Sequence, residues 1–179
     1  MDIVVPDEFK YLYENSPDRP VTKVPAPVLR QKATPVESVS PKIDKLINEM
    51  LRVLKLANGV GLAAPQLSVG KRIIVVAPLD MKPIVLINPV ITEAKGEQIG
   101  QEGCLSIPGL YGDVKRASHV VVDAYDRKGK SVTYDMEGMA ARIVQHEVDH
   151  LDGILFIDKV DMSTLHWEHP GGPDDADAE

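Results

Sequence analysis

The segment over residues 138–152 limits most strongly how this chain can fold. Its spacing predicts a helix with Met139, Ile143 and His146 on one face, and Gly153 follows it as a stop signal. Because apolar residues lead directly into the histidine, this face must be at least partly buried. A buried imidazole needs a hydrogen-bond partner or a metal ion, so another part of the chain has to cover the helix.

The remaining periodic segments predict one α+β domain. A first helix is predicted over residues 41–56, with Ser40 as its N-cap, Pro41 at its first position and Asn58-Gly59 as its stop. Strand-like runs follow over residues 72–77, 84–91, 119–126 and 131–136, and the last two are joined by a hairpin signal at residues 127–130. This grouping predicts antiparallel pairing and not an alternation of strands and helices.

The ends of the chain differ from its middle in composition. Residues 1–22 are rich in proline and charge without sustained periodicity, and we expect them to form an N-terminal extension over the surface. Residues 23–166 are expected to form a single folded domain. Residues 167–179 are expected to be an acidic, disordered tail.

Charge and hydropathy exclude several classes of partner. Residues 1–160 carry 20 basic and 21 acidic side chains, and the rest of the chain adds six acids and no base. There is no basic stripe of the kind that binds nucleic acid. The longest apolar run, residues 73–77, is too short to span a bilayer, and residues 1–8 lack the features of a secretory signal. We therefore expect a cytoplasmic protein that does not bind membranes.

Residues 146–150 read His-Glu-Val-Asp-His, which matches the pattern H-E-x-x-H. On a helix, His146 and His150 lie one turn apart on one face and can place two imidazoles on one metal ion. Glu147 is rotated by about 100° from His146, close enough to reach water at the metal without being a ligand. The alternative is a polar helical turn that matches the pattern by chance.

A catalytic metal site of this type needs a third ligand. The residues after His150 do not have the downstream spacing of the zincin proteases. Upstream, residues 102–106 read Glu-Gly-Cys-Leu-Ser and contain Cys104, the only cysteine. A lone cysteine is more often an inert core residue, but beside an H-E-x-x-H helix a thiolate ligand becomes the better interpretation.

A third segment, residues 59–66, reads Gly-Val-Gly-Leu-Ala-Ala-Pro-Gln. Its small residues allow the backbone to pass close to a ligand, and Gln66 offers an uncharged donor to a developing oxyanion. Close packing is the alternative explanation for such a segment. It lacks the features of a phosphate-binding loop.

Together and in this order, the three segments resemble the signature motifs of the peptide deformylase family. Those motifs are G-φ-G-φ-A-A-x-Q, E-G-C-φ-S and H-E-φ-D-H, where φ is apolar, and each is complete here. The similarity extends from residues 24–30 to residues 155–156. It implies an α+β fold in which antiparallel sheets surround the central helix that carries His-Glu-Val-Asp-His.

The resemblance also implies roles for individual residues. The metal ligands would be Cys104, His146 and His150. Glu147 would be the general acid and base, and Gln66 with the backbone N–H of Leu105 would form the oxyanion hole.

Substrate contacts are implied at Gly61 and Val60, which would lie along the substrate backbone. Met139 and Ile143 share the face of His146 and are candidates for an apolar side-chain pocket, although ordinary core packing explains them equally well.

The implied activity is metal-dependent hydrolysis of the formyl group on the N-terminal formylmethionine of new polypeptides, with release of formate. Iron(II) would be the usual physiological metal, and zinc, nickel or cobalt could substitute. The implied partners are nascent chains and, transiently, the ribosome, although the acidic end of this chain does not match the basic C-terminal helix of some members. Two alternatives are a zincin-like endopeptidase and a non-catalytic binding protein on the same scaffold. Loss of Glu147 or Gln66 would favour the second, and both are present.

Overall fold

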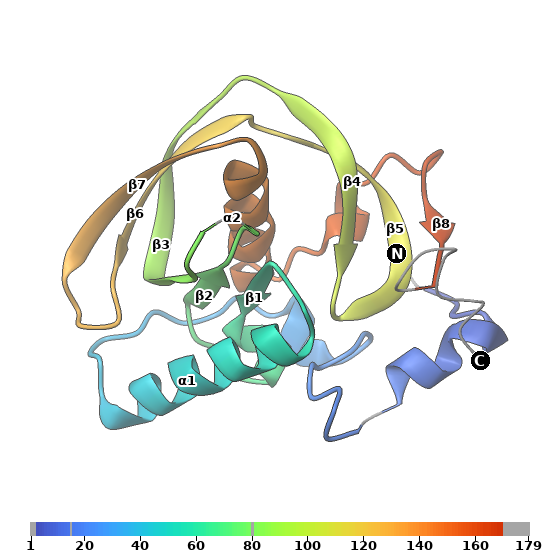
Figure 1. Cartoon of the computed structure of the whole chain (residues 1–179), viewed down its shortest axis with the longest axis horizontal. Helices are drawn as coiled ribbons and strands as arrows, with labels where there is room; N and C mark the ends of the chain where they lie inside the picture. Colours follow the sequence, from blue (N-terminus) through green and yellow to red (C-terminus); the bar gives the residue numbers. More distant parts are fainter. Residues whose placement is uncertain (1–2, 15, 80, 170–179) are drawn as a thin grey trace.

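The computed structural model describes residues 3–14, 16–79 and 81–169. Two antiparallel sheets lie on either side of the helix α2 (Gly138–Leu151) (Figure 1). The expected α+β class, with antiparallel sheets around a central helix, is confirmed. Helix α2 ends one residue before the predicted limit.

The larger sheet has five strands in the order β1-β2-β3-β6-β7, and every neighbouring pair is antiparallel. Its strands are β1 (Gly61–Ala63), β2 (Ile73–Val76), β3 (Ile84–Lys95), β6 (His119–Tyr125) and β7 (Ser131–Glu137). Four of them match the predicted runs. The short edge strand β1 lies in the Gly-Ala-rich segment and was not predicted.

The smaller sheet has the order β4-β5-β8, with β4 (Gln98–Cys104), β5 (Ile107–Arg116) and β8 (His166–Trp167). None of these strands was predicted: the glycines and charged residues of β4 and β5 give them little strand propensity, and β8 has only two residues. Hydrogen bonding between strands stabilises them instead. Strands β4 and β5 form a hairpin whose register shifts between Gly103 and Cys104.

Helix α1 (Pro41–Leu56) has the predicted bounds. The Ser40 side chain caps it by accepting a hydrogen bond from the backbone N–H of Ile43 at 3.4 Å. The described part of the chain also contains four short 3₁₀ helices: η1 (Asp7–Tyr13), η2 (Pro27–Arg30), η3 (Ala64–Leu67) and η4 (Phe156–Asp158). Within the described residues, no helix is long and apolar enough to cross a membrane.

Strand β2 separates two layers of the core. All four of its residues are fully buried, which requires cover on both faces of the sheet. Ile74 and Val76 pack with α2, whereas Ile73 and Val75 pack with α1. A third cluster lies around β5 and η4. The two helices therefore cover opposite faces of the larger sheet at β2, and α2 is packed at the centre of the fold.

Both ends of the described chain pack against β5. In the expected N-terminal extension, Phe9 and Leu12 are buried on η1. The tail boundary expected after residue 166 falls inside β8, and Trp167 pairs with Leu110. The ring centroids of Trp167 and Phe9 lie 5.1 Å apart, so these two side chains pack against each other. Residues 170–179, the rest of the expected tail, lie outside the described residues.

Replacement of Ile47 tests the packing of α1. Ile47 is fully buried, so Ile47→Ala should lower the free energy of unfolding by about 2–5 kcal/mol through lost burial and a residual cavity. Lys45→Ala, at an exposed position of the same helix, should change it by less than about 0.5 kcal/mol. Urea denaturation measures both. Equal effects would contradict the packing of α1 on the sheet.

Candidate metal centre and catalytic cavity

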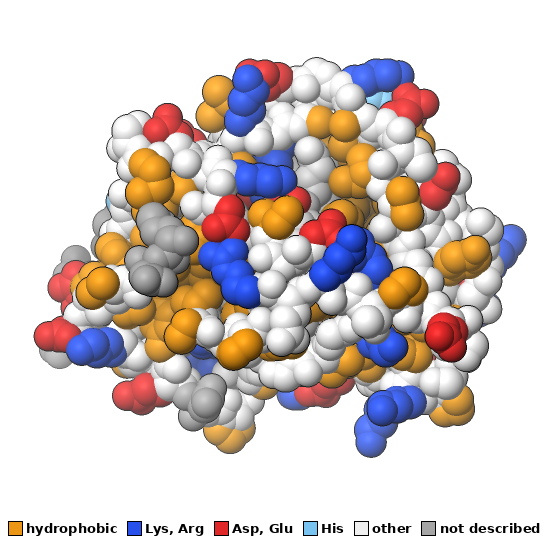
Figure 2. All heavy atoms as spheres, turned by 180° about the vertical axis from the view of Figure 1, so that it is seen from behind, with side chains coloured by type: hydrophobic (Ala, Val, Ile, Leu, Met, Phe, Trp, Pro, Cys, Tyr) orange, Lys and Arg blue, Asp and Glu red, His pale blue; other side chains and the backbone are white. Residues whose placement is uncertain are grey.

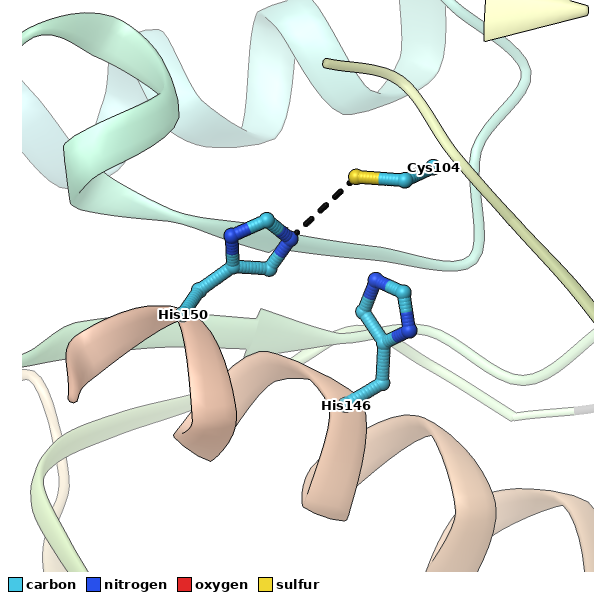
Figure 3. A group of neighbouring side chains, drawn as sticks. All are labelled: Cys104, His146 and His150. Carbon is cyan, nitrogen blue, oxygen red and sulfur yellow. Dashed lines mark hydrogen bonds between the residues drawn. The ribbon is translucent and has the colours of Figure 1, made fainter. Parts of the chain in front are cut away.

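Three potential metal ligands from two elements meet at one point. His146 and His150 project from successive turns of α2 towards Cys104, the last residue of β4 (Figure 3). The Cys104 Sγ lies 3.3 Å from the Nε2 of His150, and one ligand atom from each residue lies within 4.8 Å of the others. The structure thus brings together a thiol and two imidazoles, a set that can hold a divalent ion.

A buried carboxylate orients one of the imidazoles. The Nδ1 of His146 lies 2.9 Å from Glu102 Oε2, which leaves its Nε2 for the shared site. Glu102 is held in turn by Arg116, whose Nε and Nη2 donate to the two carboxylate oxygens at 2.9 Å. Arg142 Nη1 donates to Oε1 at 2.7 Å. All three side chains of this ion-pair network are buried.

Neither these two arginines nor a role for Glu102 was predicted from the sequence. One signal was available: Arg142 lies between Ala141 and Ile143 on the helix that was expected to be buried. A charged residue at such a position requires a partner, but the pattern does not name it.

Charge and burial shift the pKa values around the site. Burial would raise the pKa of Glu102, but hydrogen bonds from His146 and Arg116 lower it to about 2. Burial lowers the pKa of His150 well below its usual value, which favours the neutral imidazole that a metal needs. Burial opposes a charge on His146 too, yet its hydrogen bonds to Cys104 and Glu102 raise its pKa well above the usual value. The surroundings of this imidazole therefore favour a positive charge.

Glu147 lies beside the three potential ligands but is not one of them. It is only 4% exposed, and its Oε2 has no hydrogen-bond partner within the described part of the chain. Burial raises the pKa of Glu147 to about 7. Its Oε1 lies so close to Gly61 that a Cβ on that glycine would sit 2.3 Å away. A carboxyl group with this pKa can accept and donate a proton at neutral pH.

Gln66 is held in one orientation. Its Oε1 accepts a hydrogen bond from the backbone N–H of Ala63 at 2.9 Å, and its Nε2 donates to Ser106 Oγ at 3.1 Å. The same nitrogen lies 3.6 Å from Cys104 Sγ. The short helix η3 thus directs an amide donor towards the three potential ligands.

A cavity of about 380 Å³ opens beside these groups. The residues expected to contact substrate or the oxyanion, Val60, Gly61, Leu105 and Ile143, all line it. Ile143 is 4% exposed and belongs to the core, so core packing explains its position, and its contact with substrate stays a prediction. Met139 also lines the cavity but is 62% exposed, which places it at the rim.

The sequence model of the family described as "Polypeptide deformylase" matches residues 18–165, most of the chain. The chain belongs to this family. The peptide deformylase of Desulfitobacterium hafniense is 50% identical over 139 residues, covering 78% of this chain and 92% of the relative. That of Dictyoglomus thermophilum is 49% identical over 150 residues, covering 84% and 97%. The chain is therefore a peptide deformylase by family, and the zincin-like and non-catalytic alternatives are set aside.

Solved peptide deformylases share this fold. The structure from Legionella pneumophila superposes with a TM-score of 0.77 at 41% identity, covering 81% of this chain and 87% of the other. A Met-Ala-Ser-bound structure from Acinetobacter baumannii gives a TM-score of 0.76 at 40% identity, covering 79% and 97%. Residues before position 18 lie outside the family match.

The face of the molecule shown in Figure 2 has Lys and Arg side chains interspersed with Asp and Glu. No extended basic patch is visible on it. This distribution agrees with the nearly balanced charge of residues 1–160.

The contact between Gly61 and Glu147 is testable. In Gly61→Ala the new methyl group would clash with the Glu147 carboxylate and with Ile143 Cγ2, 2.8 Å away, so the carboxylate must move. We expect a fall in kcat/KM of roughly 100-fold, because small displacements of catalytic groups have effects of this size. Gly70→Ala is the matched control, since a Cβ there meets nothing within 4 Å. Unchanged kinetics in Gly61→Ala would contradict the contact.

Proposed function

We propose that the chain removes the formyl group from the N-terminal formylmethionine of newly made polypeptides, by metal-dependent hydrolysis that releases formate. The observation that carries the proposal is the meeting of Cys104, His146 and His150 within 4.8 Å, beside a buried carboxyl group and at a cavity. Membership in the family supports it.

The residues fit a divalent metal ion. One thiolate and two imidazoles form a mixed donor set that iron(II), zinc, nickel and cobalt can all accept. Because the surroundings of His146 favour its charged form, binding of the ion would displace the proton from its Nε2. Glu102 occupies the Nδ1 of His146, so its Nε2 is left for an ion, as is typical of metal-binding histidines. When bound, the ion would activate water and polarise the formyl carbonyl. We propose iron(II) as the physiological ion.

Glu147 would move the proton. Its carboxylate lies beside the ligand group and takes a proton from the attacking water, then donates it to the amine nitrogen that leaves. The apolar surroundings of Glu147 suit this shuttle, because they raise the affinity of its carboxylate for the proton.

Gln66 and Leu105 would stabilise the negative charge that develops on the formyl oxygen. The Gln66 amide is held by Ala63 and Ser106, so its Nε2 needs little reorganisation to donate. Leu105 follows Cys104 directly, and its backbone N–H is proposed as the second donor.

Peptide binding would use the cavity and the edge of β1. The formyl group is small, so most of the binding energy must come from the methionine side chain and the peptide backbone. Strand β1 is an edge strand, and edge strands can pair with an extended peptide. Val60 and Gly61 would lie along that backbone, and Ile143 would contact the side chain. The Met-Ala-Ser-bound relative supports a peptide with N-terminal methionine.

Formate release from formyl-Met-Ala-Ser, with metal analysis of the same sample, tests the proposal. We expect one equivalent of formate per peptide and one metal ion per chain, with activity lost after chelation and restored by iron(II), nickel or cobalt. Hydrolysis of internal bonds in unformylated peptides, or formate release by metal-free protein, would contradict it.

The role of Glu147 predicts a separation of metal binding from catalysis. Glu147→Gln is nearly isosteric and should keep the metal, but it should lower kcat by about 10² to 10⁴, the usual effect of losing a general base. Steady-state kinetics and metal analysis measure the two effects. Loss of the metal would make Glu147 a ligand, and an unchanged kcat would remove it from the mechanism.

The role of Cys104 predicts that its replacement impairs metal binding itself, in contrast to the replacement of Glu147. A serine hydroxyl is not ionised at neutral pH, so it is a much poorer ligand than a thiolate. Replacing a residue that only orients a ligand can weaken metal binding by roughly 100-fold, and Cys104→Ser, which removes a ligand, should weaken it at least as much. Competition with a chromogenic chelator measures the affinity, and Glu147→Gln is the control that keeps all three ligands. Full occupancy in Cys104→Ser would take the thiolate out of the site.

A further inference from the structure

One wall of the cavity is a bulge in the β4–β5 hairpin. In this pair the register goes from Gly103 opposite Tyr111 directly to Cys104 opposite Ile107, so residues 108–110 protrude from the ladder. Pro108, Gly109 and Tyr111 all line the cavity. A bulge leaves residues without ladder partners, so this wall needs support from outside its own hairpin.

Residues ahead of the family match supply part of that support. Phe9 and Leu12 are 2% and 7% exposed, and their spacing of three residues places them on one face of the 3₁₀ helix η1. A Cβ built on Gly109 would lie 2.8 Å from Phe9 Cδ1 and 3.3 Å from Leu12 Cδ1. The backbone of the bulge therefore rests directly on η1, with no side chain between them.

The C-terminal segment holds the same bulge from its edge. Glu168 donates its backbone N–H to the carbonyl oxygen of Gly109 at 2.8 Å, and Trp167 pairs with Leu110. The ring of Phe9 packs against this segment as well as against the bulge, with centroid distances of 5.1 Å to Trp167 and 4.5 Å to His169. In Figure 1, η1 and β8 lie on the same side of the molecule, next to β5.

We propose that Phe9 is a positioning residue for peptide binding: through Gly109 it holds residues 108–111 in the shape that receives the part of the substrate that follows the N-terminal methionine. This inference rests on the proposed deformylase function. It gives residues 7–13 a role that lies outside the segment shared with the family.

The physical consequence is specific to binding. Without the Phe9 ring the bulge loses its packing partner and gains conformational freedom, which a bound peptide would have to remove. The metal ligands and Glu147 lie on α2 and at the end of β4, so the chemical step should change little. The defect should therefore appear in KM, and more strongly for a long peptide than for a short one.

The experiment compares formyl-Met-Ala-Ser with formyl-methionine amide at a temperature where every variant is folded. For Phe9→Ala we expect KM for the longer substrate to rise roughly tenfold, because its binding surface is misplaced. The kcat should change by less than about twofold, and KM for the short substrate should rise less than KM for the long one. Phe9→Leu should restore most of the affinity. Hydrogen exchange should show faster exchange at residues 109–111 in Phe9→Ala.

Ile47→Ala is the matched control, because it removes a buried side chain of the distant helix α1 and lowers stability without touching the bulge. It should leave both KM values unchanged. If Phe9→Ala does not fold, Leu12→Ala gives the same test with a smaller shift, since Leu12 Cδ1 also lies against Gly109. Unchanged KM values, equal effects on both substrates, or the same kinetics in Ile47→Ala would overturn the inference. Inactive wild-type protein would instead sink the proposed function.

Discussion

The carboxylate of Glu102 connects the elements that form the site. It accepts hydrogen bonds from Arg116 on β5, from Arg142 on α2 and from the imidazole of His146. Glu102 itself lies on β4, two residues before Cys104. The distance between the cysteine on the smaller sheet and the histidines on the helix therefore depends on one buried ion-pair network.

Such a network is tightly constrained because its members are buried. Each charge is costly to remove from water, and the loss of one partner would leave the others unpaired. Additional bonds complete it: Arg142 Nη1 donates to the carbonyl oxygen of Val114 at 2.9 Å, and Arg116 Nη1 donates to Asp149 Oδ2 at 2.5 Å. Asp149 is part of the His-Glu-Val-Asp-His motif on α2, and Arg116 lies on β5. The bond between them therefore helps to hold the helix against the smaller sheet.

The two sheets have different tasks around this network. In the larger sheet, β2 is covered on one face by α1 and on the other by α2, and the sheet supports the helix that carries His146, Glu147 and His150. The smaller sheet contributes Cys104 and the bulged wall of the cavity, and it is supported by η1 and β8 at the two ends of the described chain. The cavity lies where these parts meet, which explains why its lining comes from segments far apart in the sequence.

The sequence alone determined the local features whose cause is local. Helical spacing and capping at Ser40 predicted α1, and strand-like apolar runs predicted most of the larger sheet, because these signals lie within a few residues of each other. Three motifs, each a short continuous stretch of sequence, also identified the family and the residues proposed as ligands.

Only the tertiary structure decided the rest. Strands β4 and β5 have weak propensities and exist through pairing, the partners of Arg116 and Arg142 lie on other elements, and Phe9 and Trp167 acquire a role only in contact with each other. The physical reason is the same in each case: a local pattern can show that a residue is buried or extended, but it does not show which distant residue it pairs with.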